Sequence, residues 1–296
     1  MNELFVLIND DLIPAAAASL GVSDLAIQRG YGIFDFFKTL DQRPVFLDDH
    51  LDRFFHSAEQ LRLPIGKTRE QLRALIHTLQ QKNNIPDSGI RMTLTGGYSP
   101  DGFSLTRPAP SPDPTAPPAG RPNLIITQQP LTAPITGDLA KSIRLVTYQH
   151  QRQMPEIKTI DYLMGIWLQP FIKDTCADDV LYHQNNIITE CPRSNFFIVT
   201  ADNTIVTPDR HILKGIIRMK VLALARQQFQ VDERDITLDE LKTAKEAFIT
   251  STTKHLIPVV QIDNTIIGKG LPGEITRRLH RELYEMIMEQ QAKLIE

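Results

Sequence analysis

Four stretches in the second half of the sequence carry residues that could do chemistry on one ligand. Lys158 lies at the start of a predicted apolar helix, and apolar surroundings favour the neutral amine, which can attack an aldehyde. Glu190 supplies a carboxylate at the end of a predicted strand. Residues 213–217 bring Gly215 to a predicted helix start, and residues 250–253 are a run of hydroxyl side chains at another strand end. Together they offer an amine, an acid and two places for an anion.

Pyridoxal 5'-phosphate is a cofactor whose groups match these four stretches. Its aldehyde would react with Lys158, and Glu190 would keep the ring nitrogen protonated so that the ring draws electrons. Its phosphate would bind the free N–H groups at the helix start after Gly215 and the hydroxyls of residues 250–253. Taken singly, each residue also has an ordinary interpretation: a solvated lysine, a surface glutamate, a plain helix start and a solvated strand end.

Length and composition exclude several classes of protein. A chain of 296 residues can form two domains of ordinary size, and its net charge of -3 gives no case for binding nucleic acid or an acidic membrane. No apolar run is long enough to cross a bilayer, and the first residues do not resemble a signal peptide. The two cysteines, Cys176 and Cys191, form no metal-ligand spacing or disulfide framework. These features predict a cytoplasmic protein.

The first half is predicted to mix strands and helices. A helix should begin at Asp48 or Asp49 as its cap, and a second should follow the capping box of Thr68 and Gln71. Arg53 lies near the front of the first of these helices, either as a solvated side chain or as an anion clamp. Strands are expected at residues 4–9, 12–13, 33–37, 45–47, 89–95 and 123–127, with a connector at 23–28 and a proline-rich surface loop at 108–122.

Residues 128–136 are predicted to link a first domain, residues 1–127, to a second, residues 137–296. In the second domain a helix should follow Lys158 and be kinked at Pro170. Thr237 and Glu240 form a capping box for a short helix, and Asn185-Asn186 is a turn pair between the strands at 179–183 and 187–189. Other helices are expected at residues 215–229 and 273–290, and strands at 142–148, 179–183, 187–189, 195–200, 204–206, 231–235, 247–250, 258–262 and 265–267.

Six markers in this order resemble one family. They are Arg-Gly-Tyr-Gly-Ile-Phe-Asp at 29–35, His-Leu-Asp-Arg at 50–53, Ile-Lys at 157–158, Thr-Glu-Cys-Pro-Arg-Ser-Asn at 189–195, Ile-Leu-Lys-Gly-Ile-Ile-Arg at 212–218 and Thr-Ser-Thr-Thr at 250–253. Over nearly its whole length the chain resembles the class IV aminotransferases, the fold-type IV enzymes that use pyridoxal phosphate. The resemblance implies a small α+β N-terminal domain, a larger C-terminal pseudo-barrel domain, a cofactor between them and a homodimer.

The same resemblance implies roles for individual residues. Lys158 matches the lysine that forms a Schiff base with the cofactor and moves the proton between the substrate Cα and the cofactor. Glu190 matches the partner of the pyridine nitrogen. The residues that match the phosphate site are Arg53, Ile216, Ile217 and Thr252, with Ser251 as a helper. Ser194 and Asn195, from the marker around Glu190, are assigned to the cofactor, and Tyr31 and Thr253 to the substrate.

Among the members of this family, the run Thr-Ser-Thr-Thr at 250–253 most resembles D-amino-acid transaminase. The Arg-x-His pair by which those enzymes usually hold the substrate carboxylate is missing after the strand at 89–95. We therefore expect Arg29 and Arg91 to hold it instead, although Arg29 could form a structural ion pair and Arg91 could bind a distal carboxylate. The resemblance leaves three alternatives: a branched-chain L-amino-acid aminotransferase, an aminodeoxychorismate lyase and a non-catalytic paralogue.

Overall fold

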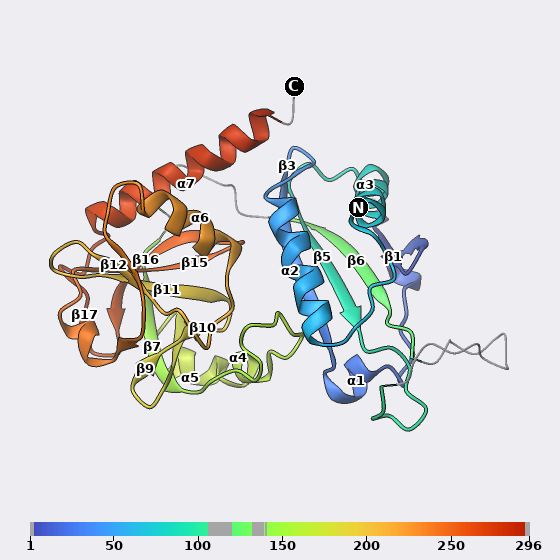
Figure 1. Cartoon of the computed structure of the whole chain (residues 1–296), viewed down its shortest axis with the longest axis horizontal. Coiled ribbons are helices and arrows are strands. Elements are labelled where there is room, and N and C mark those ends of the chain that lie inside the picture. Colours follow the sequence, from blue (N-terminus) through green and yellow to red (C-terminus); the bar gives the residue numbers. More distant parts are fainter. Residues whose placement is uncertain (1–2, 106–119, 132–138, 140, 294–296) are drawn as a thin grey trace. The chain divides into compact units, whose positions relative to one another are not determined.

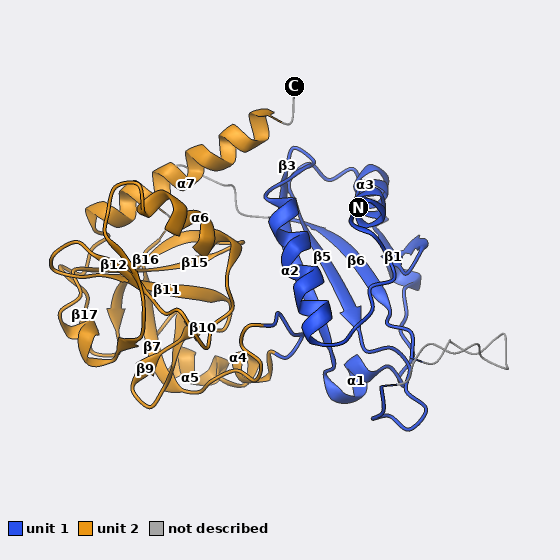
Figure 2. Ribbon diagram, viewed as in Figure 1, with its two compact units in different colours: residues 1–133, 157–161 blue, residues 134–156, 162–296 orange. Residues whose placement is uncertain are grey.

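The computed structural model describes residues 3–105, 120–131, 139 and 141–293. The chain divides into two compact units (Figure 2). The first unit contains residues 1–133 and 157–161, and the second contains residues 134–156 and 162–296. The chain therefore leaves the first unit, returns to it for five residues, and leaves it again.

The first unit is built on an antiparallel sheet (Figure 1). Its strands lie in the order β2 (Asp11–Pro14), β1 (Phe5–Ile8), β6 (Leu124–Pro130), β5 (Ser88–Thr95), β3 (Gly32–Leu40) and β4 (Arg43–Pro44). The helical elements are the 3-10 turn η1 (Ala15–Ala17), α1 (Leu25–Arg29), α2 (Leu47–Gln60) and α3 (Arg69–Asn83).

Alternation along β3 decides which side chains enter the core of the first unit. Ile33 and Phe37 pack with Leu51 and Phe54 of α2, and all four side chains are fully buried. Because successive strand residues point to opposite faces, Phe34, Phe36 and Lys38 lie on the other face of the sheet. The same alternation puts Arg91 of β5 on that other face, since its neighbours Ile90 and Met92 are in the core.

Residues 157–161 form a short extended segment against the edge of β3. The Phe34 N–H donates to the Lys158 carbonyl at 3.0 Å, and the Ile160 N–H donates to the Gly32 carbonyl at 3.0 Å. An isolated antiparallel bridge joins Ile33 and Thr159. These bonds fix the backbone of Lys158 beside the strand that carries Phe34.

The second unit contains a mixed sheet. Its main path runs through β13 (Val231–Glu233), β12 (Ile205–Thr207), β11 (Ser194–Val199), β15 (Glu246–Ser251), β16 (His255–Ile262), β7 (Ile143–Gln149), β8 (Asp179–Gln184), β9 (Ile187–Ile188) and β14 (Ile236–Thr237). Two short strands join it at the side: β10 (Glu190–Cys191) pairs with β11, and β17 (Thr265–Ile266) pairs with β16.

The helices of the second unit pack on this sheet. α6 (Ile216–Ala225) contacts β15, and α7 (Glu274–Lys293) contacts β15, β16 and α6. α4 (Leu163–Trp167) and α5 (Gln169–Asp174) follow each other closely, and Leu168 and Ile172 pack with Val180 of β8. The 3-10 turn η2 (Asp239–Lys242) follows β14. The two-unit α+β architecture agrees with the predicted fold class.

Several local predictions are confirmed. Thr68 and Gln71 form both hydrogen bonds of the capping box of α3. Asn185 and Asn186 have φ angles of 50° and 64° and turn the chain between β8 and β9. The predicted break near Pro170 is found, since the helix ends at Leu168 and Pro170 lies in the first turn of α5; the helix itself begins at Leu163 and not at Lys158, which lies in an extended segment.

Other local predictions are wrong. Residues 24–29 are not a plain connector, because the Asp24 side chain caps α1. The predicted strand at 45–47 is missing, since the chain enters α2 through Phe46 in a left-handed conformation with φ 53°. For that reason Asp48 and Asp49 lie in the first turn of α2 instead of capping it.

The predicted domain limits differ from the two units in two places. The predicted linker begins at Gln128, but β6 continues to Pro130 through ladder bonds with β5. Residues 157–161 are predicted in the second domain, yet their hydrogen bonds to β3 place them in the first unit. Residues 108–119 of the predicted proline-rich loop lie outside the described residues.

Across the described part of the chain, no helix has both the length and the hydropathy that crossing a lipid bilayer requires.

Candidate active site

Lys158 in the first unit is half-buried beside the edge of β3. Its Nζ lies 4.5 Å from the centroid of the Phe34 ring, and its backbone N–H donates to the Ser57 hydroxyl of α2 at 3.3 Å. The guanidinium carbon of Arg91 lies 4.1 Å from the centroid of the same ring. Phe34 therefore brings together the predicted amine and one of the two predicted substrate arginines.

A buried charge cluster lies between β3 and α2. Arg53 donates to both oxygens of Asp35, from Nε and from Nη2, at 2.8 Å each. His50 Nδ1 lies 2.7 Å from Asp35 Oδ1. His50 and Arg53 are three residues apart on α2, so both reach the same side of the helix. Asp35 thus fixes the arginine that is predicted to bind the cofactor phosphate, while Arg53 Nη1 forms no hydrogen bond with a described residue.

The cluster shifts the pKa values of its members. Complete burial by itself raises the pKa of Asp35, but the charges and hydrogen bonds of Arg53 and His50 outweigh burial and hold that pKa well below its usual range. Burial lowers the pKa of His50, and the nearby charges of Arg53 and Lys158 lower it further against the opposing effect of Asp35. The arrangement thus favours an ionised Asp35 and a neutral His50.

The other predicted substrate residues of the first unit, Tyr31 and Arg29, have hydrogen-bond partners of their own. The Tyr31 hydroxyl donates to the Leu61 carbonyl, and burial raises the pKa of this tyrosine. Arg29 is exposed at the end of α1 and donates to the carbonyl of its neighbour Gln28 at 2.8 Å. The hydrogen bonds of Arg29 therefore do not connect it to Lys158.

In the second unit, three polar side chains form a row across neighbouring strands. Glu190 of β10 pairs with Asn195 of β11, and Asn195 pairs with Thr250 of β15. Directly paired residues of antiparallel strands point to the same face, and neighbouring strands lie about 4.8 Å apart. A carboxylate, an amide and a hydroxyl are thereby lined up on one side of the sheet, all nearly buried.

The loop before α6 is fastened to this row. The Leu213 N–H donates to Glu190 Oε2 at 3.0 Å, and the Leu213 carbonyl accepts from Asn195 Nδ2 at 2.7 Å. A Cβ added at Gly215 would stand 2.1 Å from Asn195 Oδ1, so any other residue there would force the loop or the amide to move. Asn195 therefore holds the loop before α6, and its predicted contact with the cofactor stays a prediction.

The start of α6 is suited to an anion. Gly215 is the N-cap, no side chain caps the helix, and its first turn contains no acidic residue. The N–H groups of Ile216 and Ile217 are among the four at a helix start that have no partner within the helix. The hydroxyls of Ser194 and Thr250 are buried and form no hydrogen bond with a described residue.

The remaining hydroxyls of the predicted site lie where β15 turns into β16. Ser251 Oγ accepts from the Lys254 N–H at 3.2 Å. Thr252 and Thr253 form the turn itself, with Thr253 exposed. The second unit thus joins Glu190, Asn195, Gly215 and Thr250 through strand pairing and the loop before α6.

Sequence reasoning missed four residues of these two groups. Asp35 and His50 both lie inside the family markers. The i, i+3 spacing between His50 and Arg53 is the signal that could have identified His50. In the sequence, Thr250 is one of four hydroxyl residues in a run. It could not be singled out, because the strand register that pairs it with Asn195 is not visible in a sequence. Arg152 has no local signal at all, although its side chain contacts Glu190.

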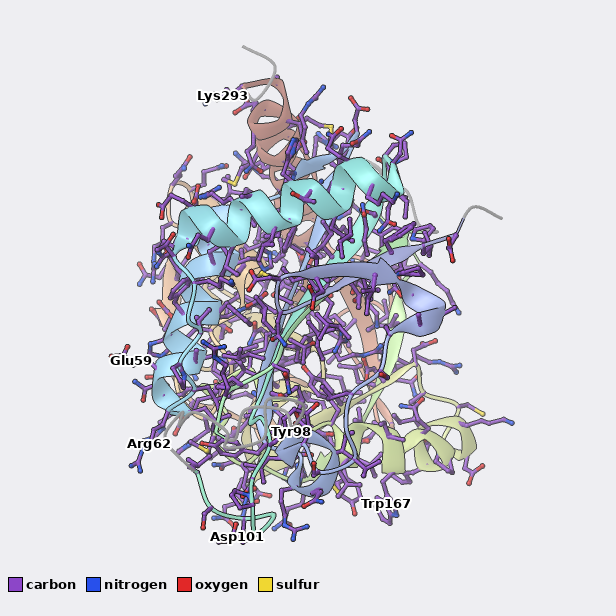
Figure 3. All side chains as sticks on the ribbon, turned by 90° about the vertical axis from the view of Figure 1, so that its right-hand side faces the viewer. Glu59, Arg62, Tyr98, Asp101, Trp167 and Lys293 are labelled. Carbon is purple, nitrogen blue, oxygen red and sulfur yellow. The ribbon has the colours of Figure 1, made fainter. Side chains whose placement is uncertain are left out.

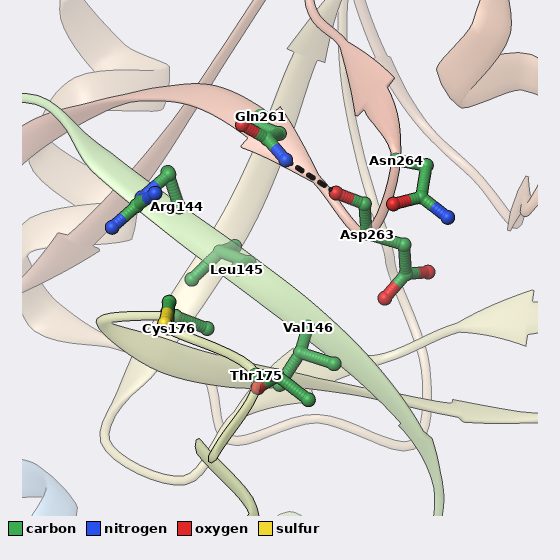
Figure 4. A pocket seen from close by; sticks show the side chains of 9 residues that line it. Arg144, Leu145, Val146, Thr175, Cys176, Gln261, Asp263 and Asn264 are labelled. Atoms are coloured by element: carbon green, nitrogen blue, oxygen red, sulfur yellow. Dashed lines mark hydrogen bonds between the residues drawn. The ribbon is translucent and has the colours of Figure 1, made fainter. Parts of the chain in front are cut away.

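A separate cavity of about 350 Å³ lies elsewhere in the second unit (Figure 4). It is lined by residues that include Arg144, Cys176 and Asp263, and the Gln261 side chain donates to the Asp263 carbonyl at 2.6 Å. None of the residues predicted for the cofactor or the substrate lines it. The group around Lys158 in the first unit and the group around Glu190 in the second therefore remain the candidate functional residues.

Comparison with known proteins identifies the family of the chain. The model of the family described as amino-transferase class IV matches residues 32–262. The chain is 29% identical to a D-alanine aminotransferase of Bacillus licheniformis, over 98% of this chain and 99% of that protein. It is 28% identical to a putative branched-chain-amino-acid aminotransferase of Methanocaldococcus jannaschii, over 95% and 96% of the two chains.

The fold is also found among solved structures. A branched-chain amino acid aminotransferase from Escherichia coli has a TM-score of 0.83 and 20% identity, covering 97% of this chain and 95% of that one. This likeness shows a fold-type IV architecture. With the family match over most of its length, the chain belongs to the class IV aminotransferases.

Proposed function

We propose that this protein is a transaminase that uses pyridoxal 5'-phosphate to move the amino group of a D-amino acid to a 2-oxo acid, 2-oxoglutarate or pyruvate. The observation that carries the proposal is the similarity to D-alanine aminotransferase along almost the entire chain. The local geometry of the two units supports it.

The residues of the second unit fit the cofactor. Two buried hydroxyls, those of Ser194 and Thr250, form no hydrogen bond with a described residue, and such groups are rarely left unsatisfied in a native protein. The uncapped start of α6 offers backbone N–H groups to a phosphate. The Glu190 carboxylate is an acceptor of the kind that suits a protonated ring nitrogen, because both of its oxygens carry lone pairs for hydrogen bonds.

In the proposed reaction each residue has a separate task. When bound, the cofactor ring accepts the electron pair released at the substrate Cα. Lys158 would take the proton from the substrate Cα and deliver it to the cofactor, while Glu190 would keep the ring nitrogen protonated. Arg53, fixed by Asp35, would bind the phosphate with Ile216, Ile217, Ser251 and Thr252.

Arg91 is the favoured cation for the substrate carboxylate. It shares the Phe34 ring with Lys158, so an amino acid held near that amine would lie within the field of the guanidinium. Arg29, Tyr31 and Thr253 stay predictions as substrate residues. We expect Arg91→Ala to raise the KM for D-alanine and D-glutamate at least tenfold, about 1.4 kcal/mol. A KM that barely moves would reject this role.

The substrate assay decides between the proposal and its alternatives. Purified protein with bound cofactor should absorb visible light and bleach when an amino donor is added. D-alanine and D-glutamate should bleach it and turn over with 2-oxo acids, whereas L-leucine should not. Turnover of L-leucine or L-isoleucine instead would favour a branched-chain enzyme, which the Methanocaldococcus jannaschii relative supports. Pyruvate release from aminodeoxychorismate would indicate the lyase, and no turnover a non-catalytic paralogue.

A homodimer and a cytoplasmic location complete the proposal. Leu163, Ile166 and Trp167 of α4 expose 70%, 71% and 61% of their surface, and Trp167 projects at the outside of the molecule (Figure 3). Such exposed apolar side chains support contact with a second copy. Cys176 and Cys191 are unpaired thiols, which supports a reducing compartment. Light scattering on the purified protein would test the dimer.

A further inference from the structure

Arg152 forms a buried bridge in the second unit. Its Nε donates to Glu190 Oε1 at 2.8 Å, and its Nη2 lies 2.8 Å from the same oxygen. The same Nη2 also donates to the carbonyl of Pro155, three residues before Lys158. The side chains of Arg152 and Glu190 are only 12% and 6% exposed. The guanidinium thus connects the acid to the turn that leads into the lysine segment.

The charge of Arg152 matters because Glu190 is buried. Burial disfavours an ionised carboxylate, and a neighbouring cation favours it. Arginine stays protonated at every physiological pH and has a rigid planar fork, so it fixes direction as well as charge. A second donor, the Leu213 N–H, holds Oε2. Both oxygens of Glu190 are therefore oriented before any ligand binds.

We infer that Arg152 is a positioning residue for the cofactor, which keeps Glu190 ionised and aimed at the ring nitrogen of pyridoxal phosphate. The inference rests on the proposed function and deepens it. Arg152 acts through Glu190, so it needs no contact with the cofactor itself. Its bond to Pro155 also ties the position of the acid to the stretch of chain that enters the Lys158 segment.

A purely structural role for Arg152 makes a different prediction. If the pair only stabilised the second unit, its loss would lower the melting temperature of the apoprotein and would affect the affinity for pyridoxal phosphate independently of Glu190. If Arg152 acts through Glu190, the two residues are coupled in cofactor binding, and a double-mutant cycle measures that coupling.

The experiment compares the wild type with Arg152→Met, Glu190→Gln and the double variant. For each, the dissociation constant of pyridoxal phosphate is measured by absorbance, and the apoprotein is melted to check folding. Arg152→Met should weaken binding roughly ten- to hundredfold, the size expected for hydrogen bonds to a charged group. In the Glu190→Gln background the same change should cost less than about threefold, because the carboxylate it acts on is gone.

Two further variants make the result specific. Arg152→Lys keeps the positive charge but lacks the planar guanidinium, so its affinity for pyridoxal phosphate should lie between those of the wild type and Arg152→Met. If Arg152→Met does not fold, Arg152→Lys takes its place in the double-mutant cycle. Arg210→Met removes another arginine–carboxylate pair of the second unit, the one with Asp235, and should leave the affinity within about twofold of the wild type.

Wild-type affinity in Arg152→Met, or an equal loss in both backgrounds, would overturn the inference alone. A wild-type protein that takes up no pyridoxal phosphate would overturn the proposed function and this inference with it.

Discussion

Asp35 and its two basic neighbours show how single residues in the first unit depend on one another. Asp35 is fully buried, and its carboxylate is shared by Arg53 and His50. Replacing the aspartate would leave the arginine buried without a partner, which is among the most costly changes in a protein. The phosphate role proposed for Arg53 therefore depends on a residue that need not touch the phosphate.

His50 should make the stability of the protein depend on pH. Burial lowers its pKa from the ordinary value of 6.5, so below that pH the unfolded chain binds a proton more readily than the folded one. The contribution of the neutral His50 to the free energy of unfolding is therefore fully present above pH 6.5 and is lost as the pH falls below it. Urea unfolding should show wild type and His50→Asn converging between pH 7.5 and 5. His56→Asn, an exposed position on the same helix, should not change the slope.

Lys38 presents the opposite case, a buried cation that costs stability. It is 3% exposed on the same sheet face as Phe34, no described carboxylate pairs with it, and burial lowers its pKa to about 8. Below pH 8 the buried amine carries its charge, and the full cost of burying that charge lowers the free energy of unfolding. The cost fades as the pH rises from about 8 toward 10.5. Lys38→Met should raise the free energy of unfolding by about 1–3 kcal/mol at pH 7 and by little at pH 10.

Lys67→Met is the matched control for Lys38, since Lys67 pairs with Asp10. It should not stabilise the protein at pH 7. A destabilised Lys38→Met at that pH would show that the amine has a compensating partner and would contradict the argument.

Residue types and their order along the chain single out Lys158, Glu190 and Arg53 as candidate site residues. The partners that make them useful are not predictable in this way, because Arg152 reaches Glu190 across 38 residues of chain and Thr250 reaches Asn195 across 55. A sequence shows local spacing, whereas these pairs depend on strand register and on a loop returning to the sheet.

At the scale of elements, the start of α6 depends on a glycine. Gly215→Ala would bring a Cβ to 2.1 Å from Asn195 Oδ1, so the loop or the amide must move. We expect roughly tenfold weaker binding of pyridoxal phosphate, the value of about one charged hydrogen bond, and little change for pyridoxal, which lacks the phosphate. Gly165→Ala, whose nearest contact is 3.2 Å, is the control. Equal losses for both ligands would contradict a phosphate site at α6.

Helices and strands with strong local signals are predicted well. The capping box of α3 and the asparagine pair between β8 and β9 specify their own geometry within a few residues. The predicted start of α2 is wrong because Phe46 is the N-cap, in a left-handed conformation that its residue type does not favour. A prediction from residue types instead gives the cap to an aspartate. Phe46 is buried, and burial among residues distant in the chain is not part of local propensity.

At the scale of the whole molecule, the path of the chain places the two main chemical groups in different units. Lys158 belongs to the first unit through its strand-like pairing with β3, and Glu190 belongs to the second through β10. The sequence predicts two domains with α+β content but assigns the lysine segment to the second domain. No residue type in 157–161 indicates that this segment pairs with β3, more than a hundred residues earlier in the chain.

Above all, we propose that the amine of Lys158 binds the cofactor aldehyde. Borohydride reduction of the protein loaded with pyridoxal phosphate makes the bond between amine and aldehyde permanent, and peptide mass spectrometry then locates it. We predict a single modified lysine, Lys158, and none in Lys158→Ala. Modification of another lysine, such as the buried Lys38, or no modification of the coloured protein, would contradict the account.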